Sequence, residues 1–185
     1  MILSKEDFQK VYEILDSATP ISGDCGKKCG ALCCLPKPIF QYNSLLIYLL
    51  PGEDSLHDKE DPWLKWYSLN TKKYLFPKSW GKRFRAVRCS GPSKCKRNLR
   101  PIQCRTFPLM PYLTPDEKLQ LILYNQPLPY QCPLITDSIS LNKPFAENVR
   151  KAWKILLQDT RIFDYVKGES EHIRKTLDAI QVIEE

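Results

Sequence analysis

The stretch Cys25-Gly26-Lys27-Lys28-Cys29-Gly30-Ala31-Leu32-Cys33-Cys34 decides how this chain is organised. It holds four of the protein's eight cysteines within ten residues, at the spacing C-x3-C-x3-C-C. Thiolates are soft, strongly binding metal ligands, and a short loop lets several of them reach one ion or cluster. Gly26 and Gly30 each follow a cysteine, where a backbone free to adopt positive φ helps a loop to wrap around an ion. The stretch therefore predicts a metal site.

The other four cysteines lie far down the chain, and we expect them to return to this loop. In a secreted protein eight cysteines would indicate four disulfides, but the N-terminus has mixed charges and no apolar segment behind them, unlike a signal peptide. The longest apolar run, residues 45–50, is too short to cross a bilayer. We therefore expect a cytoplasmic protein with reduced thiols and no membrane partner. The predicted metal ligands are Cys25, Cys29, Cys33, Cys34, Cys89, Cys95, Cys104 and Cys132.

Helices are predicted at both ends of the chain. Ser4 and Asp7 have the spacing of a capping box, and apolar residues at helical intervals follow them, which predicts a helix over residues 5–17. Helical periodicity returns in residues 145–185. Apolar residues recur there at helical intervals, so that Phe145, Val149, Trp153 and Leu156 share one helix face and Ile173, Leu177 and Ile180 share another.

Strands are predicted in the middle of the chain, over residues 39–50, 83–88 and 119–124, which are rich in strand-forming side chains. The prolines between residues 101 and 111 predict an irregular segment. Residues 1–185 are thus predicted to form one α+β domain. It would have a small irregular sheet and cysteine-rich metal-binding loops, residues 24–134, packed with the N- and C-terminal helices.

Few other residues point to chemistry. His57 lies in an acidic run and His172 on a polar helical face, so both are expected to be solvated, because eight cysteines already suffice as ligands. The aromatic residues between positions 63 and 84 are expected to be mostly core, although Trp63 and Trp66 could line a binding site. No phosphate-binding glycine loop, Ser-His-Asp set or paired-carboxylate motif occurs, so no catalytic residue is assigned.

Positive charge is concentrated in one segment. The chain has a formal net charge of +7, yet residues 62–115 contain thirteen Lys and Arg and no Asp or Glu. Such one-sided runs indicate an anionic or protein partner, or compensation of thiolate charge at a metal centre. We expect Arg100 and Arg105, which flank Cys104, to face inward and to hydrogen-bond ligating sulfurs. Solvent-facing cations are expected at Lys72-Lys73, Lys82-Arg83 and Lys94.

The cysteine stretch, taken together with Arg100-Pro101-Ile102-Gln103-Cys104-Arg105-Thr106-Phe107-Pro108, resembles the YkgJ-like family of zinc- or iron-chelating proteins. Members of that family carry a CxxCxxCC-type cluster, a further cysteine, an R-P-x-x-C-R-x-F/Y-P stretch and a final cysteine. Cys95 and Cys132 fall where the preceding and final cysteines would lie. The resemblance covers about residues 24–134, with gaps of three rather than two residues in the cluster. It implies a cofactor that is zinc or iron, including an iron–sulfur cluster.

Three classes of function remain open from the sequence. The first is a metal-binding protein whose structural metal supports binding to a protein or other macromolecule. The second is an iron–sulfur enzyme of methyl-transfer or redox chemistry, since one relative, the flagellin lysine methylase, uses such a cluster. The third is a nucleic-acid-binding zinc module that works through the basic segment. Two four-thiolate ions, one thiolate-bridged pair, and one cluster with spare thiols all fit eight cysteines.

Overall fold

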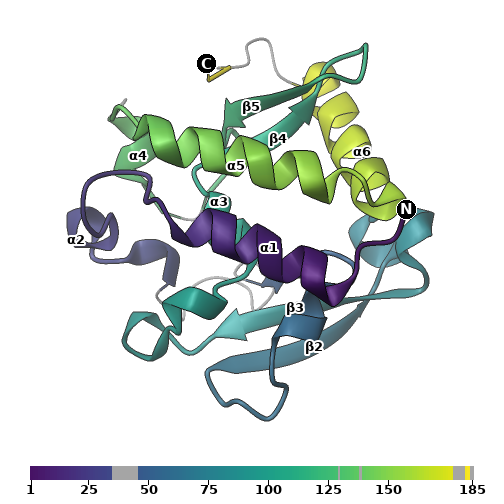
Figure 1. The fold of residues 1–185 in the computed structure, drawn as a ribbon, viewed down its shortest axis with the longest axis horizontal. Coiled ribbons are helices and arrows are strands. Elements are labelled where there is room, and N and C mark those ends of the chain that lie inside the picture. The colour runs from purple at the N-terminus through teal and green to yellow at the C-terminus, as the bar shows by residue number, and fades with distance from the viewer. Residues whose placement is uncertain (35–45, 129, 138, 177–181, 184–185) are drawn as a thin grey trace.

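The computed structural model of the chain describes residues 1–34, 46–128, 130–137, 139–176 and 182–183. The α+β expectation is confirmed, because helices and two small antiparallel sheets make up this part of the chain (Figure 1). Its helices are α1 (Lys5–Asp16), α2 (Gly26–Cys29), α3 (Ile102–Thr106), α4 (Pro133–Thr136), α5 (Lys143–Leu156) and α6 (Thr160–Thr176). Its strands are β1 (Ile47–Tyr48), β2 (Leu64–Asn70), β3 (Arg83–Cys89), β4 (Leu109–Leu113) and β5 (Leu119–Leu123).

The first helix begins at the capping box that the sequence predicts. The Ser4 hydroxyl accepts from the Asp7 N–H at 3.2 Å, and the Asp7 carboxylate accepts from the Ser4 N–H at 2.9 Å. These two bonds satisfy backbone donors that no helical partner could reach. The apolar face of α1 is then buried along its whole length through Phe8, Val11, Tyr12 and Leu15.

The larger sheet has the order β1-β3-β2, with β3 in the middle. Residues of β2 pair with β3 from Leu64 opposite Cys89 to Asn70 opposite Arg83. This register agrees with the strand predicted to end at Cys89. Of the strand predicted over 39–50, the structure has β1, while residues 39–45 lie outside the described residues.

The smaller sheet is the β4–β5 hairpin, and it corrects one prediction. Residues 101–111 were expected to be irregular, but α3 and the first part of β4 occupy much of this segment. Pro111 stands inside β4 opposite Leu121. A proline removes one strand donor only, so it is tolerated on a strand side that has no partner to lose. The strand predicted over 119–124 is confirmed as β5.

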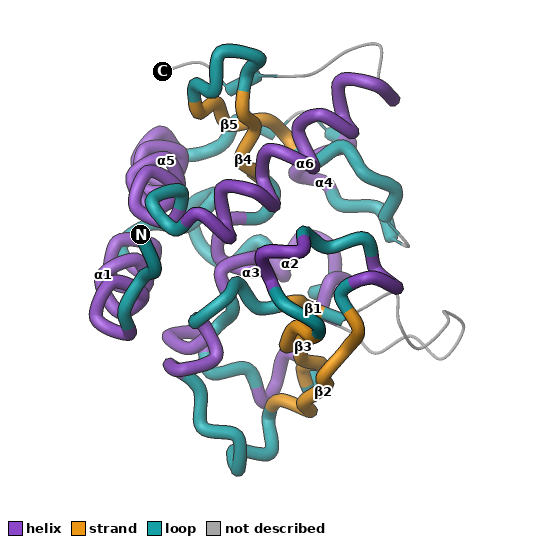
Figure 2. The backbone as a smooth tube through the Cα atoms, turned by 90° about the vertical axis from the view of Figure 1, so that its right-hand side faces the viewer, coloured by secondary structure: helices purple, strands orange, loops and turns teal. Residues whose placement is uncertain are grey.

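The main apolar core joins both ends of the chain. Buried side chains of α1, α5 and α6 meet those of β3, β4 and β5 in one cluster, which includes Phe8, Phe84, Leu121 and Phe145. In Figures 1 and 2 the helices α1 and α5 lie side by side, with the β1-β3-β2 sheet at one end of the molecule and the β4–β5 hairpin at the other. The terminal helices therefore hold the two sheets together.

Gly52, in the turn after β1, packs so closely against Phe8 of α1 that there is little room for a larger side chain. Its φ is +102°, and a Cβ there would lie 3.0 Å from Phe8 Cε2 in the core. We predict that Gly52→Ala destabilises the protein by about 2–4 kcal/mol, because it combines a left-handed backbone penalty with overpacking. The matched control is Gly168→Ala in α6, where no atom lies within 4 Å. This change should stabilise by up to about 1 kcal/mol. Urea denaturation measures both, and equal effects of the two substitutions would contradict the prediction.

Candidate metal centre

The cysteine loop is a short helix followed by a left-handed turn. Asp24 begins it, because its Oδ1 accepts from the Gly26 N–H at 3.0 Å, and α2 then ends at Gly30 with φ +64°. Ala31 follows with φ +56°, and the Cys34 N–H donates to the Ala31 carbonyl at 2.8 Å. Gly30 thus has the predicted positive φ, whereas Gly26 is helical. Glycine suits position 26 because a Cβ would lie 3.2 Å from Asp24 Oδ1.

One group of thiols forms around Cys132, at the start of α4. Cys132 is buried and Cys25 packs against the same apolar cluster, beside Ile21 and Leu134. Burial raises the pKa of the Cys25 thiol and that of the Cys132 thiol, and the nearby Cys29 raises both further. The structure therefore brings together three cysteines from two segments about a hundred residues apart in sequence.

A second group of thiols forms where β3 ends. The Gly91 N–H donates to Cys89 Sγ at 3.4 Å, and a Cβ on Gly91 would lie 4.0 Å from the Cys34 carbonyl. The thiols of Cys89 and Cys95 are neighbours, and their interaction raises the pKa of Cys89 and lowers that of Cys95. With Cys34, Cys89 and Cys95, the fourth member of this group is Cys104 in α3. Burial raises the pKa of Cys104 to about 12, and the neighbouring Cys34 and Cys95 contribute to the increase.

Cys33 and Cys34 connect the two groups. Their Sγ atoms lie 3.7 Å apart. The hydrogen bond between them raises the pKa of Cys33 and lowers that of Cys34. Cys33 is also close enough to Cys25 and Cys104 for their charges to raise its pKa. Through these neighbouring thiols, Cys33 and Cys34 link the two groups in the described part of the chain.

The two arginines beside Cys104 have different partners. Arg100 is half-buried, its Nε donates to Cys95 Sγ at 3.2 Å, and its charge lowers the pKa of Cys34, Cys95 and Cys104. Arg105 is buried but donates to carbonyl oxygens, among them that of Arg100 at 2.6 Å. Arg100 thus has the predicted contact with sulfur, whereas Arg105 supports the backbone that carries it.

The donor set fits a thiolate-preferring metal by its chemistry. Cys34, Cys89, Cys95 and Cys104 are four sulfur donors with N–H groups directed at two of the sulfurs, as ligating thiolates require. Within the described ranges, however, no three His, Cys, Asp or Glu side chains lie at coordinating positions around one point. The thiols would have to move closer together to ligate an ion.

A buried carboxylate, which the sequence analysis did not single out, fixes the segment between Cys95 and Cys104. Glu53 is 1% exposed and accepts from the Ile102 N–H at 2.7 Å, the Leu50 N–H at 2.8 Å and the Tyr12 hydroxyl at 2.9 Å. In sequence it looks like the first residue of a solvated acidic run, and only the adjacent Gly52 hints at a special backbone there.

Arg105 closes this network on the other side of Tyr12. Its guanidinium lies 4.2 Å from the centre of the Tyr12 ring and bonds Asp16 at 2.6 Å. It also donates to the carbonyls of Arg97 and Asn98, in the turn that precedes Arg100. The Asp24 carboxylate forms an ion pair with Arg97. The cysteine loop is therefore connected, through this turn, to the network of Glu53, Tyr12 and Arg105.

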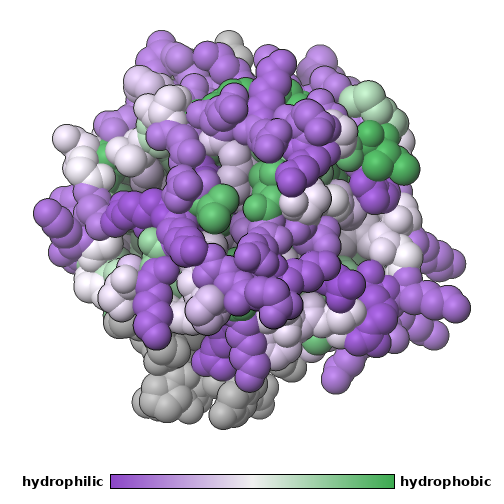
Figure 3. All heavy atoms as spheres, turned by 60° about the horizontal axis from the view of Figure 1, so that its bottom comes forward, coloured by the Kyte–Doolittle hydropathy of each residue, from purple (hydrophilic) through white to green (hydrophobic). Residues whose placement is uncertain are grey.

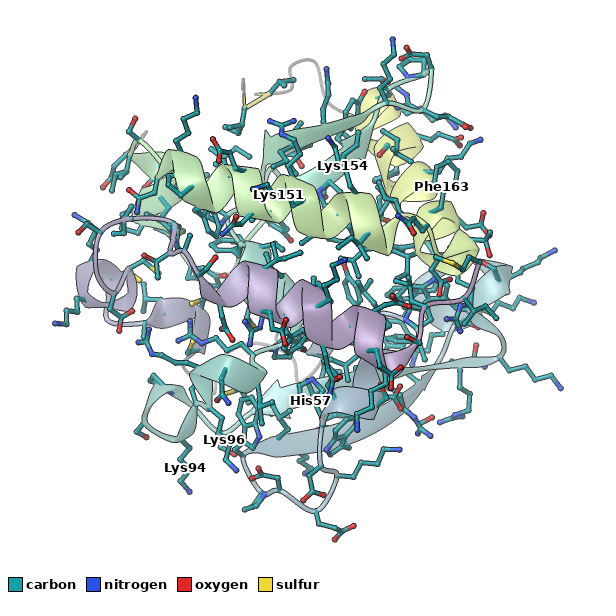
Figure 4. All side chains as sticks on the ribbon, in the orientation of Figure 1. His57, Lys94, Lys96, Lys151, Lys154 and Phe163 are labelled. Atoms are coloured by element: carbon teal, nitrogen blue, oxygen red, sulfur yellow. The ribbon has the colours of Figure 1, made fainter. Side chains whose placement is uncertain are left out.

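His57 belongs to the same network and differs from its expected solvated state. It is 7% exposed, because Trp63 and Trp66 lie beside its ring, and burial lowers its pKa. Its Nε2 lies 3.2 Å from the Tyr12 hydroxyl. Figure 4 shows His57 between α1 and the larger sheet, whereas Lys94 and Lys96, on either side of Cys95, point outward. His172 is exposed, as predicted.

Comparison of the chain with protein-family models, with curated proteins and with solved structures finds no match. In the described part of the chain, no helix has both the length and the apolar character needed to cross a membrane.

Glu53 gives stability a predictable pH dependence. Burial raises its pKa from 4.5 to about 7, so between these values the folded protein holds a proton that the unfolded chain releases. Stability from this group is therefore greatest below about pH 4.5 and falls as the pH rises to about 7, by about 3 kcal/mol. We predict that Glu53→Gln removes this slope from urea denaturation curves recorded across the range.

The control for this experiment is Glu13→Gln, which changes an exposed glutamate on α1, the helix that carries Tyr12. Its pH profile should follow that of the wild type. A Glu53→Gln profile parallel to the wild-type profile would contradict the assignment of the slope to Glu53.

Proposed function

We propose that this protein is a cysteine-ligated metal-binding protein of the YkgJ-like type, which takes zinc or iron, including an iron–sulfur cluster. The observation that carries the proposal is the position of Cys34, Cys95 and Cys104 near Arg100, with Cys89 beside Cys95. These cysteines come from four separate segments of the chain, and a set of free thiols in a cysteine-rich protein has no packing reason to gather around a cation.

The electrostatics of the four thiols support ligation. A four-thiolate site around a divalent ion carries a charge of about −2, which a nearby guanidinium stabilises. Arg100 supplies this charge next to Cys95 and Cys34, the two cysteines whose pKa is lowered. A bound zinc ion would cross-link these turns, whereas an iron–sulfur cluster would add electron transfer.

The first group, Cys25, Cys29 and Cys132, supports a further site when Cys33 is added as its fourth thiol. Cys33 and Cys34 could each belong to one group, because Cys33 lies near Cys25 and Cys34 near Cys95. The proposal is therefore two neighbouring sites, each with four cysteines.

We also place the protein in the cytoplasm. Eight cysteines that form no disulfide in the described chain favour a reducing compartment, where thiols remain available for metal.

Metal analysis of anaerobically purified protein tests the proposal. We predict about two ions per wild-type chain if the metal is zinc, or a coloured protein if it is iron–sulfur. Cys95→Ser should remove the metal of the second group, and strong chelation should lower the melting temperature, since a structural zinc site contributes on the order of 10 kcal/mol. Wild-type protein without tightly bound metal and with stability unaffected by chelator would contradict the proposal.

Arg100 provides a second, independent test. We predict that Arg100→Gln weakens metal retention about 10- to 100-fold, because it removes the N–H donor to Cys95 Sγ. Arg85→Gln, on the exposed side of β3, is the matched control, and Lys72→Ala with Lys73→Ala should likewise leave metal content unchanged. Competition with a chromophoric chelator measures retention. Loss of metal from the control variants but not from Arg100→Gln would show that the arginine assignment is incorrect.

A further inference from the structure

The connection between β2 and β3, residues 71–82, displays an apolar side chain on an otherwise basic surface. Leu75 is 92% exposed, the largest fraction among the exposed large apolar residues of the described chain. Its φ is +59°, in the left-handed region that glycine or asparagine occupies at little cost. An aliphatic residue is therefore present where both the backbone and the solvent disfavour it.

Hydrogen bonds hold this loop in one shape. The Thr71 N–H donates to the Lys82 carbonyl at 3.2 Å and its hydroxyl to the Gly81 carbonyl at 2.6 Å, so the two ends of the loop are joined. The Phe76 N–H donates back to the Thr71 carbonyl at 3.0 Å. The exposure of Leu75 is thus a property of an ordered loop.

The residues on either side of Leu75 are anchored inside. Tyr74 and Phe76 both pack against Phe84, at ring-centroid distances of 5.7 and 4.2 Å, and Phe76 also stacks on Tyr165 at 5.4 Å. With both neighbours turned inward, the left-handed conformation directs the side chain of Leu75 outward.

The same connection also carries four lysines. Lys72, Lys73, Lys78 and Lys82 are all exposed, and within the described ranges none of the four forms an ion pair. No Asp or Glu occurs between residues 62 and 115 to neutralise them. Hydrophilic side chains dominate the face shown in Figure 3, and only separate apolar patches interrupt it.

We propose that this loop docks on an anionic lipid bilayer, with Leu75 inserted at the level of the acyl chains and the four lysines against lipid phosphates. Reversible attachment to a membrane surface takes an apolar and a basic contribution together, and the loop supplies both. A nucleic-acid surface would use the lysines but not an aliphatic tip, because single strands are bound by exposed aromatic rings. Here the rings of the loop are packed in the core. The expectation of no membrane partner rested on hydropathy, which detects spanning segments and not surface contacts.

Co-sedimentation of the whole protein with vesicles tests this docking. We expect binding to vesicles rich in phosphatidylserine and little binding to phosphatidylcholine alone. Leu75→Asn suits the left-handed backbone and should keep the fold, yet it should weaken binding about tenfold. Leu75→Trp should retain binding and show a blue-shifted fluorescence change on insertion.

A charge-matched pair of variants tests the lysines. Lys72→Gln with Lys73→Gln should weaken binding about 10- to 30-fold. Lys151→Gln with Lys154→Gln removes the same charge from the exposed side of α5, labelled in Figure 4, and should leave binding unchanged. Equal losses in the two pairs, wild-type protein that ignores phosphatidylserine, or full binding by Leu75→Asn would each overturn the proposal. Tight binding of a single-stranded oligonucleotide that depends on Lys72 and Lys73, without vesicle binding, would assign the loop to nucleic acid and overturn it as well.

Discussion

The buried interaction between Glu53, Tyr12 and Arg105 is the constraint on which the rest of this structure depends. Each partner comes from a different part of the chain: Tyr12 from α1, Glu53 from the turn after β1, and Arg105 from α3. Leaving any of these groups unpaired inside the protein costs more than its hydrogen bond contributes, so the three segments have to fold together. Arg105 also forms an ion pair with Asp16 at the end of α1, which gives its buried guanidinium an anionic partner.

The cysteine region lies at the end of this network, and its geometry follows from it. Between Cys95 and Cys104 the chain has one short turn, Arg97–Leu99, and the start of the short helix α3, which by themselves would have little stability. Arg105 holds the carbonyls of the turn before Arg100, and Glu53 holds the N–H of Ile102. Arg100 is thereby directed at Cys95, and its charge also acts on the nearby Cys34 and Cys104.

The basic segment is divided between two roles by its location in the fold. Arg100 and Arg105 are turned towards the interior, where they act on sulfur and on backbone carbonyls respectively. The lysines of the β2–β3 connection face solvent, as predicted from the sequence, together with Arg83, Arg85 and Lys94. The positive charge of this segment is therefore partly hydrogen-bonded inside the protein and partly exposed on a separate surface.

Local patterns in the sequence determined the capping box and helix α1, the strand that ends at Cys89, the strand β5, the helices α5 and α6, and the α+β class. These elements follow from side-chain periodicity, which acts over a few residues. The helical prediction to residue 185 was wrong at Val182, which pairs with Ile122, and residues 177–181 and 184–185 of that range lie outside the described residues. The sequence also drew attention to the eight cysteines through their spacing and number. The tertiary structure alone decided that β4 forms in spite of Pro111, and that His57 and Glu53 of an acidic run are buried. It also decided which of the two arginines beside Cys104 touches sulfur, because burial and pairing depend on partners up to about ninety residues away in the chain.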